Sequence, residues 1–225
     1  MDLEAPIAEG LFIKRLNRFL GIVNIKGEYF YAHIHDPGRL EDLLKPGVRV
    51  YLRQGRGKYP YYIYAVEASD GLILIDSALH SRIVEWLISE GYVLNGYEIT
   101  KREVVFNKSR IDFLLRKGDA QELLEVKGCS LLKGEIALFP DAPTIRGRRH
   151  VKELINAVNR GLEAYILFLV VRPGAKLFKP NWETDPKFSQ TLLDAVKVGV
   201  KIIVYKIGIY RWKIKPLGKI PYAFR

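Results

Sequence analysis

The sequence predicts a mixed α/β fold, in which a small N-terminal β-barrel precedes a larger α/β domain with a central mixed sheet flanked by helices. Two patterns predict it: short apolar segments separated by turn residues fill the first third of the chain, and helical and strand periodicities alternate after it. The chain of 225 residues is 48% hydrophobic, which is enough for two cores. We place the domains at residues 1–75 and 76–225.

The N-terminal segment is predicted to form β-strands. They are expected at 11–13, 19–25, 29–34, 48–52, 61–66 and 72–75. Glycine-containing turns separate them, at 26–27, 37–38, 46–47 and 70–71. A short helix is expected at 39–45, and a five-stranded barrel interrupted by one helix is the oligonucleotide-binding (OB) arrangement. We therefore expect an OB-like barrel.

The rest of the chain is expected to form a helix, three strands, and then a helix, a strand, a helix and a strand. In that order they cover 77–91, 103–106, 110–115, 122–126, 151–161, 164–171, 185–199 and 200–207. Ser77 and Asp185 are typical N-cap residues. We expect the helix after Ser77 to end at Gly91 and the helix after Asp185 to end at Gly199. Because 164–171 is a continuous apolar run, we expect a strand buried on both faces.

The charge of the chain indicates an anionic partner. Lys and Arg number 36 against 25 Asp and Glu, a formal net charge of +11. Basic residues cluster at 49–58, which includes Arg56, and at 146–152, and residues 201–225 contain no acid. Such blocks suit phosphate backbones, because neutralised phosphates release counterions. The alternative, solvated surface charge, is the better interpretation for any single residue.

The sequence indicates neither a membrane-spanning or secreted protein nor a disulfide or zinc site. The longest apolar run, 164–171, is far shorter than the roughly 20 residues of a membrane span, and no signal sequence is evident. We expect a cytoplasmic protein without a membrane partner. The single cysteine, Cys129, excludes an internal disulfide, and no His/Cys cluster suggests zinc.

The barrel segment is rich in aromatic residues on which bases could stack. They are Tyr29, Phe30, Tyr31, Tyr59, Tyr61, Tyr62 and Tyr64. Arg39, Arg53 and Lys58 lie nearby in sequence and are candidates for holding phosphates. The alternative is that these aromatic residues belong to the core, as alternate aromatics in strands commonly do.

Three polar residues on two expected strands carry the candidate chemistry. Side chains alternate along a strand, so Glu125 and Lys127 share one face, about 7 Å apart. If the strand with Asp112 is a neighbour, all three side chains converge. Two carboxylates can hold Mg²⁺ or Mn²⁺, with the Val126 carbonyl as a further ligand. Lys127 is then suited to orient water or stabilise charge growing on phosphorus. The alternative is a surface ion pair at a strand edge.

An Asp followed thirteen residues later by Glu-x-Lys, in this order of elements, resembles the PD-(D/E)XK nuclease superfamily. The resemblance implies one more acid on the first helix, where Glu85 is the candidate metal ligand; solvent exposure is the alternative for it. Backbone N–H groups at the next helix start are expected to form a phosphate-receiving wall with Arg146, Arg148, Arg149 and His150. Pro140-Asp141 is expected to fix a turn or support the site from outside.

The chain as a whole resembles the sugar fermentation stimulation protein A (SfsA) family. The resemblance rests on residues 30–44, 110–114, 125–128, 138–150 and 185–205. It implies an N-terminal OB-like domain, a PD-(D/E)XK-like C-terminal domain and DNA binding, in a family described as regulating genes of sugar use.

We therefore expect a DNA-binding protein with a metal-dependent nuclease site. The alternatives are a non-catalytic DNA-binding regulator of sugar-metabolism genes that retains a nuclease fold, and an enzyme acting on a small phosphorylated sugar. The sequence leaves open whether the nucleic acid is DNA or RNA, single- or double-stranded, and whether the chain forms a homodimer.

Overall fold

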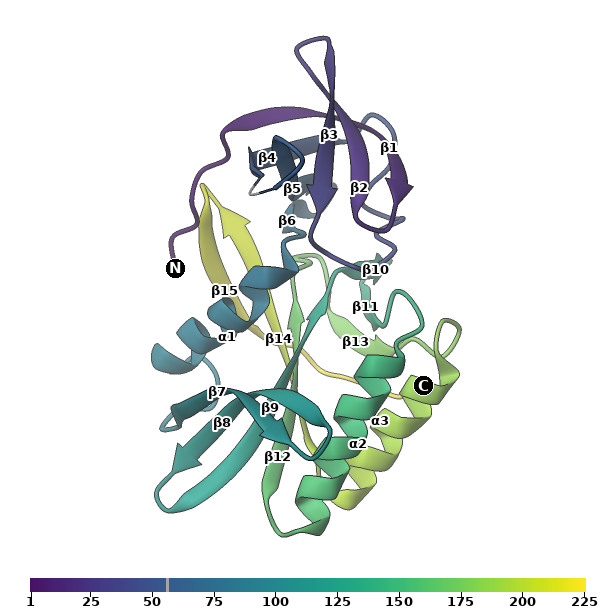
Figure 1. The fold of residues 1–225 in the computed structure, drawn as a ribbon. Helices are drawn as coiled ribbons and strands as arrows, with labels where there is room; N and C mark the ends of the chain where they lie inside the picture. Colours follow the sequence, from purple (N-terminus) through teal and green to yellow (C-terminus); the bar gives the residue numbers. More distant parts are fainter. Residues whose placement is uncertain (56) are drawn as a thin grey trace.

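A computed structural model describes residues 1–55 and 57–225. Arg56, which belongs to the basic cluster at 49–58, lies outside the described residues. The first strands are β1 (Ala8–Asn17), β2 (Leu20–Ile25), β3 (Glu28–Ile34), β4 (Arg49–Gln54) and β5 (Tyr61–Ala68). They pair in the closed ring β1–β2–β3–β5–β4–β1, in which only β3–β5 is parallel (Figure 1). This closed five-stranded barrel confirms the OB-like prediction.

The predicted helix at 39–45 is wrong. The segment makes a single turn, in which the Leu44 N–H donates to the Leu40 carbonyl at 2.8 Å. Leu40 has a left-handed backbone with φ of 54°, which a right-handed helix does not contain. Leu40 and Leu43 are nonetheless buried. The apolar pattern of this segment therefore reflects packing in the barrel core and not a helix.

The C-terminal domain is built on a sheet with strand order β6-β14-β12-β9-β8-β7. Its elements are β6 (Gly71–Leu74), the 3-10 turn η1 (Ser77–Leu79), α1 (His80–Ser89), β7 (Glu98–Phe106), β8 (Ser109–Lys117), β9 (Ala120–Cys129), α2 (Ile145–Asn159), β12 (Glu163–Val170), α3 (Pro186–Val198) and β14 (Lys201–Tyr210). β12 runs parallel to β9 and β14, whereas β7, β8 and β9 are antiparallel. The predicted mixed sheet is thus confirmed.

Four further strands were not predicted. β15 (Lys213–Lys219) pairs with β14, while β10 (Leu131–Lys133), β11 (Ile136–Phe139) and β13 (Leu177–Pro180) form a small separate sheet. Three of these are only three or four residues long, too short for side-chain alternation to identify them. No helix in the described residues is long and apolar enough to cross a membrane.

The helices cover opposite faces of the large sheet. Leu124 and Val126 of β9 pack in one core cluster with α1, whereas Leu123 packs in the other with α2 and α3. Asp185 ties the starts of α2 and α3 together, because its carboxylate accepts the Phe188 and Thr144 N–H groups, each at 2.8 Å. This link fixes the N-terminal end of α2, which borders the site described below.

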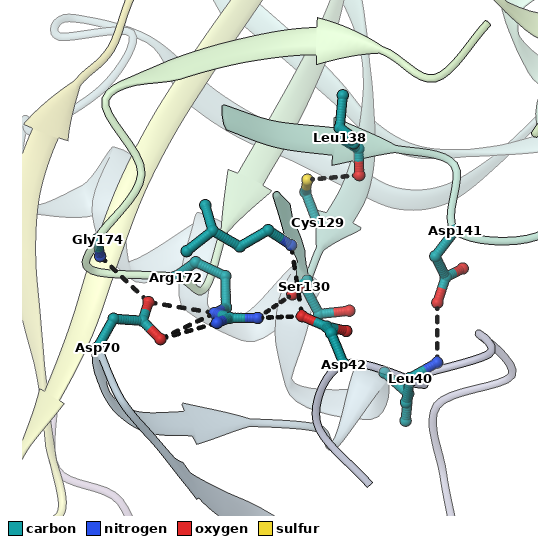
Figure 2. A network of polar contacts seen from close by, with 10 residues as sticks. Leu40, Asp42, Asp70, Cys129, Ser130, Leu138, Asp141, Arg172 and Gly174 are labelled. Atoms are coloured by element: carbon teal, nitrogen blue, oxygen red, sulfur yellow. Dashed lines mark hydrogen bonds and ion pairs between the residues drawn. The ribbon is translucent and has the colours of Figure 1, made fainter. Parts of the chain in front are cut away.

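A buried arginine joins the barrel to the C-terminal domain (Figure 2). Arg172, which is 5% exposed, donates from Nη2 to Asp70 at 2.8 Å and from Nη1 to the Ser130 carbonyl at 3.0 Å. Its Nη1 also pairs with Asp42. Asp42 and Asp70 come from loops of the N-terminal part, so one guanidinium holds both loops against the sheet.

Asp141 makes a second contact between the two parts. Its carboxylate accepts the Leu40 N–H at 3.3 Å (Figure 2). It also lies directly against Gly38. A Cβ at Gly38 would stand 2.2 Å from Asp141 Oδ2, so only glycine allows this approach. Asp141 therefore holds the loop that follows β3.

Arg172→Leu is expected to lower the free energy of unfolding by about 3 kcal/mol, because it leaves Asp42 and Asp70 without their shared cation. Urea unfolding followed by circular dichroism measures the effect. Lys133→Ala is the matched control: it breaks an ion pair with Glu183 in which both side chains are more than half exposed, so the urea midpoint should stay at the wild-type value. Equal effects of the two substitutions would contradict a clamp role for Arg172.

Candidate metal-binding and catalytic site

The site lies where β8 and β9 separate. Their ladder ends at the pair Phe113 and Leu124, one position before Asp112 and Glu125. Beyond that pair, the Val126 N–H donates to Asp112 Oδ2 at 2.7 Å. The side-chain carboxylate thus takes the place of a main-chain acceptor, which satisfies the Val126 N–H while the strands diverge. The divergence opens the sheet next to both carboxylates.

Glu125 is the buried centre of the site. It is 2% exposed, and its Oε1 accepts from Lys127 Nζ and lies 2.5 Å from His150 Nδ1. Burial opposes ionisation, but Lys127 and His150 outweigh it and lower the pKa of Glu125. Glu125 is therefore an anion at neutral pH, held on the face of the sheet that α2 covers.

Asp112 has the opposite shift. Burial, followed by the charge of Glu125, raises its pKa to about 6, although the Val126 N–H and Lys127 act against the shift. A buried carboxyl group whose pKa is raised by a neighbouring carboxylate is typical of a functional site. A cation bound between Asp112 and Glu125 would favour the ionised form of Asp112.

His150 lies between Glu125 and the arginine residues at the start of α2. It is 3% exposed, and its Nε2 accepts from Arg146 Nε at 3.4 Å. That contact leaves the proton on Nδ1, from which it is donated to Glu125. His150 was predicted as a phosphate-contacting residue, which stays a prediction; the structure shows in addition that it contacts Glu125 and is itself contacted by Arg146.

The residues present fit a divalent cation. Glu125 Oε2 is buried and has no hydrogen-bond partner in the described chain, and the charge of Glu125 raises the pKa of Asp112, so an unpaired oxygen and two interacting carboxylates occur together. No group of three or more His, Cys, Asp or Glu side chains suited to a metal occurs in residues 1–55 and 57–225. A cation here would therefore take two carboxylates and complete its shell with water or main-chain oxygen, as Mg²⁺ commonly does.

A cationic groove begins beside the site. Its volume is about 470 Å³, and Lys108, Arg110, Arg146 and Arg149 line it together with His150. We call it the basic groove. Lys108 and Arg110 come from the β7–β8 turn and the start of β8, and Arg146 and Arg149 from the first turns of α2. Arg148 is half-buried, and its Nε has no partner among the described residues.

A second cavity separates the barrel from the C-terminal domain. This interdomain cleft has a volume of about 300 Å³ and is lined by Lys127, Arg146, Arg18, Asp36, Asp141 and His80, among others. Arg146 lines both the cleft and the basic groove, so the two cavities are adjacent at this residue, which donates to His150. His80 is fully buried against Gly128, and burial lowers its pKa to about 4.

The structure does not bring Glu85 to the carboxylates. Glu85 forms an ion pair with Arg102 of β7 and is 30% exposed. It lies on α1, which packs on the same face as Leu124 and Val126, whereas Glu125 is turned toward α2. Alternation along β9 therefore separates Glu85 from the site that it was predicted to join.

The predicted basic residues of the barrel are divided. Arg53 pairs with Glu4 and stands over the ring of Tyr64 at 5.2 Å, and Lys58 lies over Tyr59 at 5.7 Å. Arg39 is exposed and lines a groove of about 420 Å³ with Arg15 and Arg18.

The aromatic residues of the barrel are also divided. Tyr62 and Tyr64 are buried in the core, as the alternative interpretation held, while Tyr29 and Tyr31 are exposed.

Sequence reasoning missed four basic residues near the site, Lys108, Arg110, Arg15 and Arg18. The signal for two of them was present, since Lys108 and Arg110 directly precede Asp112 in a strand. Arg15 and Arg18 lie near the C-terminal domain only because Asp141 and the loop after β3 meet, which the sequence does not show.

Fold and site together define a protein in which an OB-like barrel is joined to a sheet-rich domain carrying a carboxylate and lysine cluster. The chain belongs to the sugar fermentation stimulation protein family. The family model described as "Sugar fermentation stimulation protein RE domain" matches residues 78–212, and "SfsA N-terminal OB domain" matches residues 13–75.

Similar proteins occur in Pyrobaculum, Caldivirga and Pyrococcus species. A "Sugar fermentation stimulation protein homolog" of Pyrobaculum islandicum is 48% identical over 97% of this chain and 96% of its own length. The homolog of Caldivirga maquilingensis is 46% identical, with 97% and 96% covered. The solved structure of Pyrococcus furiosus SfsA in complex with Ca²⁺ matches with a TM-score of 0.92 and 32% identity, over 100% of both chains.

Asp112→Asn should stabilise the protein at neutral pH in the presence of a chelator. Because the folded-state pKa of Asp112 is about 6 and its unfolded value is 3.8, wild-type stability falls as pH rises from about 4 to 6. The variant lacks this loss and still offers an oxygen to the Val126 N–H. We expect it to be about 3 kcal/mol more stable above pH 6 and equal near pH 4. Urea unfolding across this pH range measures the difference; a gain that does not depend on pH would refute the assignment.

Proposed function

We propose that this chain is a DNA-binding protein with a divalent-metal-dependent phosphodiesterase, or nuclease, site at Asp112, Glu125 and Lys127. One observation carries the proposal: two buried carboxylates with opposed pKa shifts lie between two cavities, since Lys127, which pairs with Glu125, lines the interdomain cleft, and His150, which contacts Glu125, lines the basic groove. Metal-assisted phosphodiester cleavage requires carboxylates that bind the cation next to a surface that binds the phosphate backbone.

Asp112 and Glu125 would hold the cation. When bound, Mg²⁺ or Mn²⁺ supplies a Lewis acid for the phosphodiester oxygens. Two features support a divalent cation here: the unpartnered Glu125 Oε2, and the Ca²⁺ named for the related Pyrococcus furiosus structure.

The other residues of the site would position the attacking water and the carboxylates, and stabilise the charge that develops during the reaction. Lys127 Nζ, at Glu125 Oε1, is placed to orient the attacking water and to stabilise negative charge that grows on phosphorus. His150 holds the Glu125 carboxylate, and Arg146 fixes the tautomer of His150. The Val126 N–H keeps Asp112 at the fork. Each contact reduces the reorganisation that binding and reaction demand.

DNA is the proposed partner because of the charge along the groove. Lys108, Arg110 and Arg149 are exposed and lie within one groove. The net charge of +11 favours association with any polyanion, and the groove directs the backbone past the carboxylates.

Incubation with linear DNA and Mn²⁺ or Mg²⁺ should produce cleavage that a chelator stops. Glu125→Gln should reduce the rate at least about 100-fold, since it removes the ligand charge without changing the shape of the side chain. Product formation on denaturing gels measures the rate.

Glu122→Gln is the matched control. Glu122 lies on the same strand, and burial raises its pKa, so an uncharged side chain is tolerated there. Its variant should cleave at the wild-type rate. Tight DNA binding without products at any metal concentration would replace the nuclease proposal by the non-catalytic DNA-binding regulator.

The basic groove is tested by the salt dependence of DNA binding in chelator. Each of Lys108→Ala and Arg149→Ala should lower the slope of log affinity against log salt by about one, because one phosphate contact is lost. Lys133→Ala, an exposed lysine paired with Glu183 outside the groove, should leave the slope unchanged. Fluorescence anisotropy over a salt series supplies the slopes; three equal slopes would place the DNA elsewhere.

A further inference from the structure

A row of aromatic rings lies on the barrel next to the interdomain cleft. Phe19, in the β1–β2 turn, stacks on His33 with ring centroids 6.3 Å apart and planes 13° from parallel. His33 meets His35 at 4.8 Å, and His35 stacks on the buried Tyr62 at 4.2 Å. We call Phe19, His33 and His35 the aromatic shelf.

The shelf is exposed at one end and held at the other. Phe19 is 46% exposed and, with His33 and His35, borders an open hollow of about 540 Å³. His35 Nδ1 lies 3.0 Å from Asp76 Oδ1, and the His35 carbonyl accepts from Ser77 Oγ at 2.9 Å. These contacts fix His35 before any ligand arrives, which limits the entropy lost on binding.

The shelf suits a base rather than a phosphate. Burial, and next the neighbouring His35, lower the pKa of His33, so its ring is uncharged at neutral pH. The stacked rings of Phe19 and His33, whose exposed end is Phe19, attract the face of another flat ring and offer little to an anion.

The shelf is connected to the proposed catalytic site. Ser77 borders both the hollow and the cleft that contains Lys127. Arg18, next to Phe19 in the chain, is exposed and lines the cleft as well as the groove with Arg15 and Arg39. A polynucleotide that reaches Lys127 thus has cations for its backbone and the shelf for a base.

Resting on the proposed function, we propose that the substrate is single-stranded DNA, and that one of its bases, near the phosphate held at Asp112 and Glu125, stacks on Phe19. In a duplex each base face is already covered by its neighbours, so a paired strand cannot use the shelf without unstacking. The bases of a single strand have free faces. The volume of the cleft, about 300 Å³, is at the lower end of the range for ligand-binding pockets, so the cleft admits only a small part of a polynucleotide.

The test measures binding in chelator, so that cleavage plays no part. Fluorescence anisotropy compares a single strand of about 12 thymidines with a fully paired hairpin of similar charge. Phe19→Leu, which keeps apolar volume but removes the ring, should weaken single-strand binding about tenfold and hairpin binding less than twofold. Phe19→Trp should bind the single strand at least as tightly as the wild type.

Tyr29→Ala is the matched control. Tyr29 is 69% exposed on the same barrel but does not border the hollow, and its variant should bind both DNAs as the wild type does. Unchanged hairpin binding also shows that each variant is folded. An equal loss for both DNAs in Phe19→Leu, or a selective loss only in Tyr29→Ala, would overturn the inference. A protein that never cleaves can still pass this test, so the two proposals fail separately.

Discussion

The hydrogen bond from the Val126 N–H to Asp112 marks the point where two strands part, and the site depends on that parting. Had the ladder continued, the Val126 N–H would meet a main-chain oxygen and Asp112 would be free to turn to solvent. Instead the carboxylate is drawn to the sheet, beside the charge of Glu125. Burial and the charge of Glu125 together raise the pKa of Asp112, and a bound cation would oppose both effects.

The two oxygens of Glu125 have different surroundings. Oε1 is shared between Lys127 and His150, which keeps the side chain ionised and fixed, whereas Oε2 has no partner in the described chain. One oxygen of Glu125 therefore holds the side chain in place, and the other is free to bind a cation. The chain from Arg146 through His150 to Glu125 extends this order to the mouth of the basic groove, so the groove and the carboxylates are parts of one charge system.

Local patterns predicted most of the fold. The apolar run at 164–171 and the cap at Asp185 identified their elements because each signal lies within a few neighbouring residues. The predicted cap at Ser77 is wrong, because Asp76 caps the turn before α1 and Ser77 donates to the His35 carbonyl instead. The same locality placed Asp112, Glu125 and Lys127 on adjoining strands. It failed where the decision is tertiary: Glu85 faces away because α1 covers the other side of the sheet, and the loop at 39–45 is shaped by Asp141, about a hundred residues away. His150 could not be assigned, because its contact with Glu125 depends on how α2 packs.

β6 pairs with β5 of the barrel and also with β14 of the large sheet. Ile75 and Asp76, where the chain passes from one part to the other, are 0% and 4% exposed. A protease therefore meets no open tether at this junction, and the barrel cannot be released intact by a single cut there. Degradation of the chain through this segment has to wait for cooperative opening of both parts, which links its lifetime to global stability.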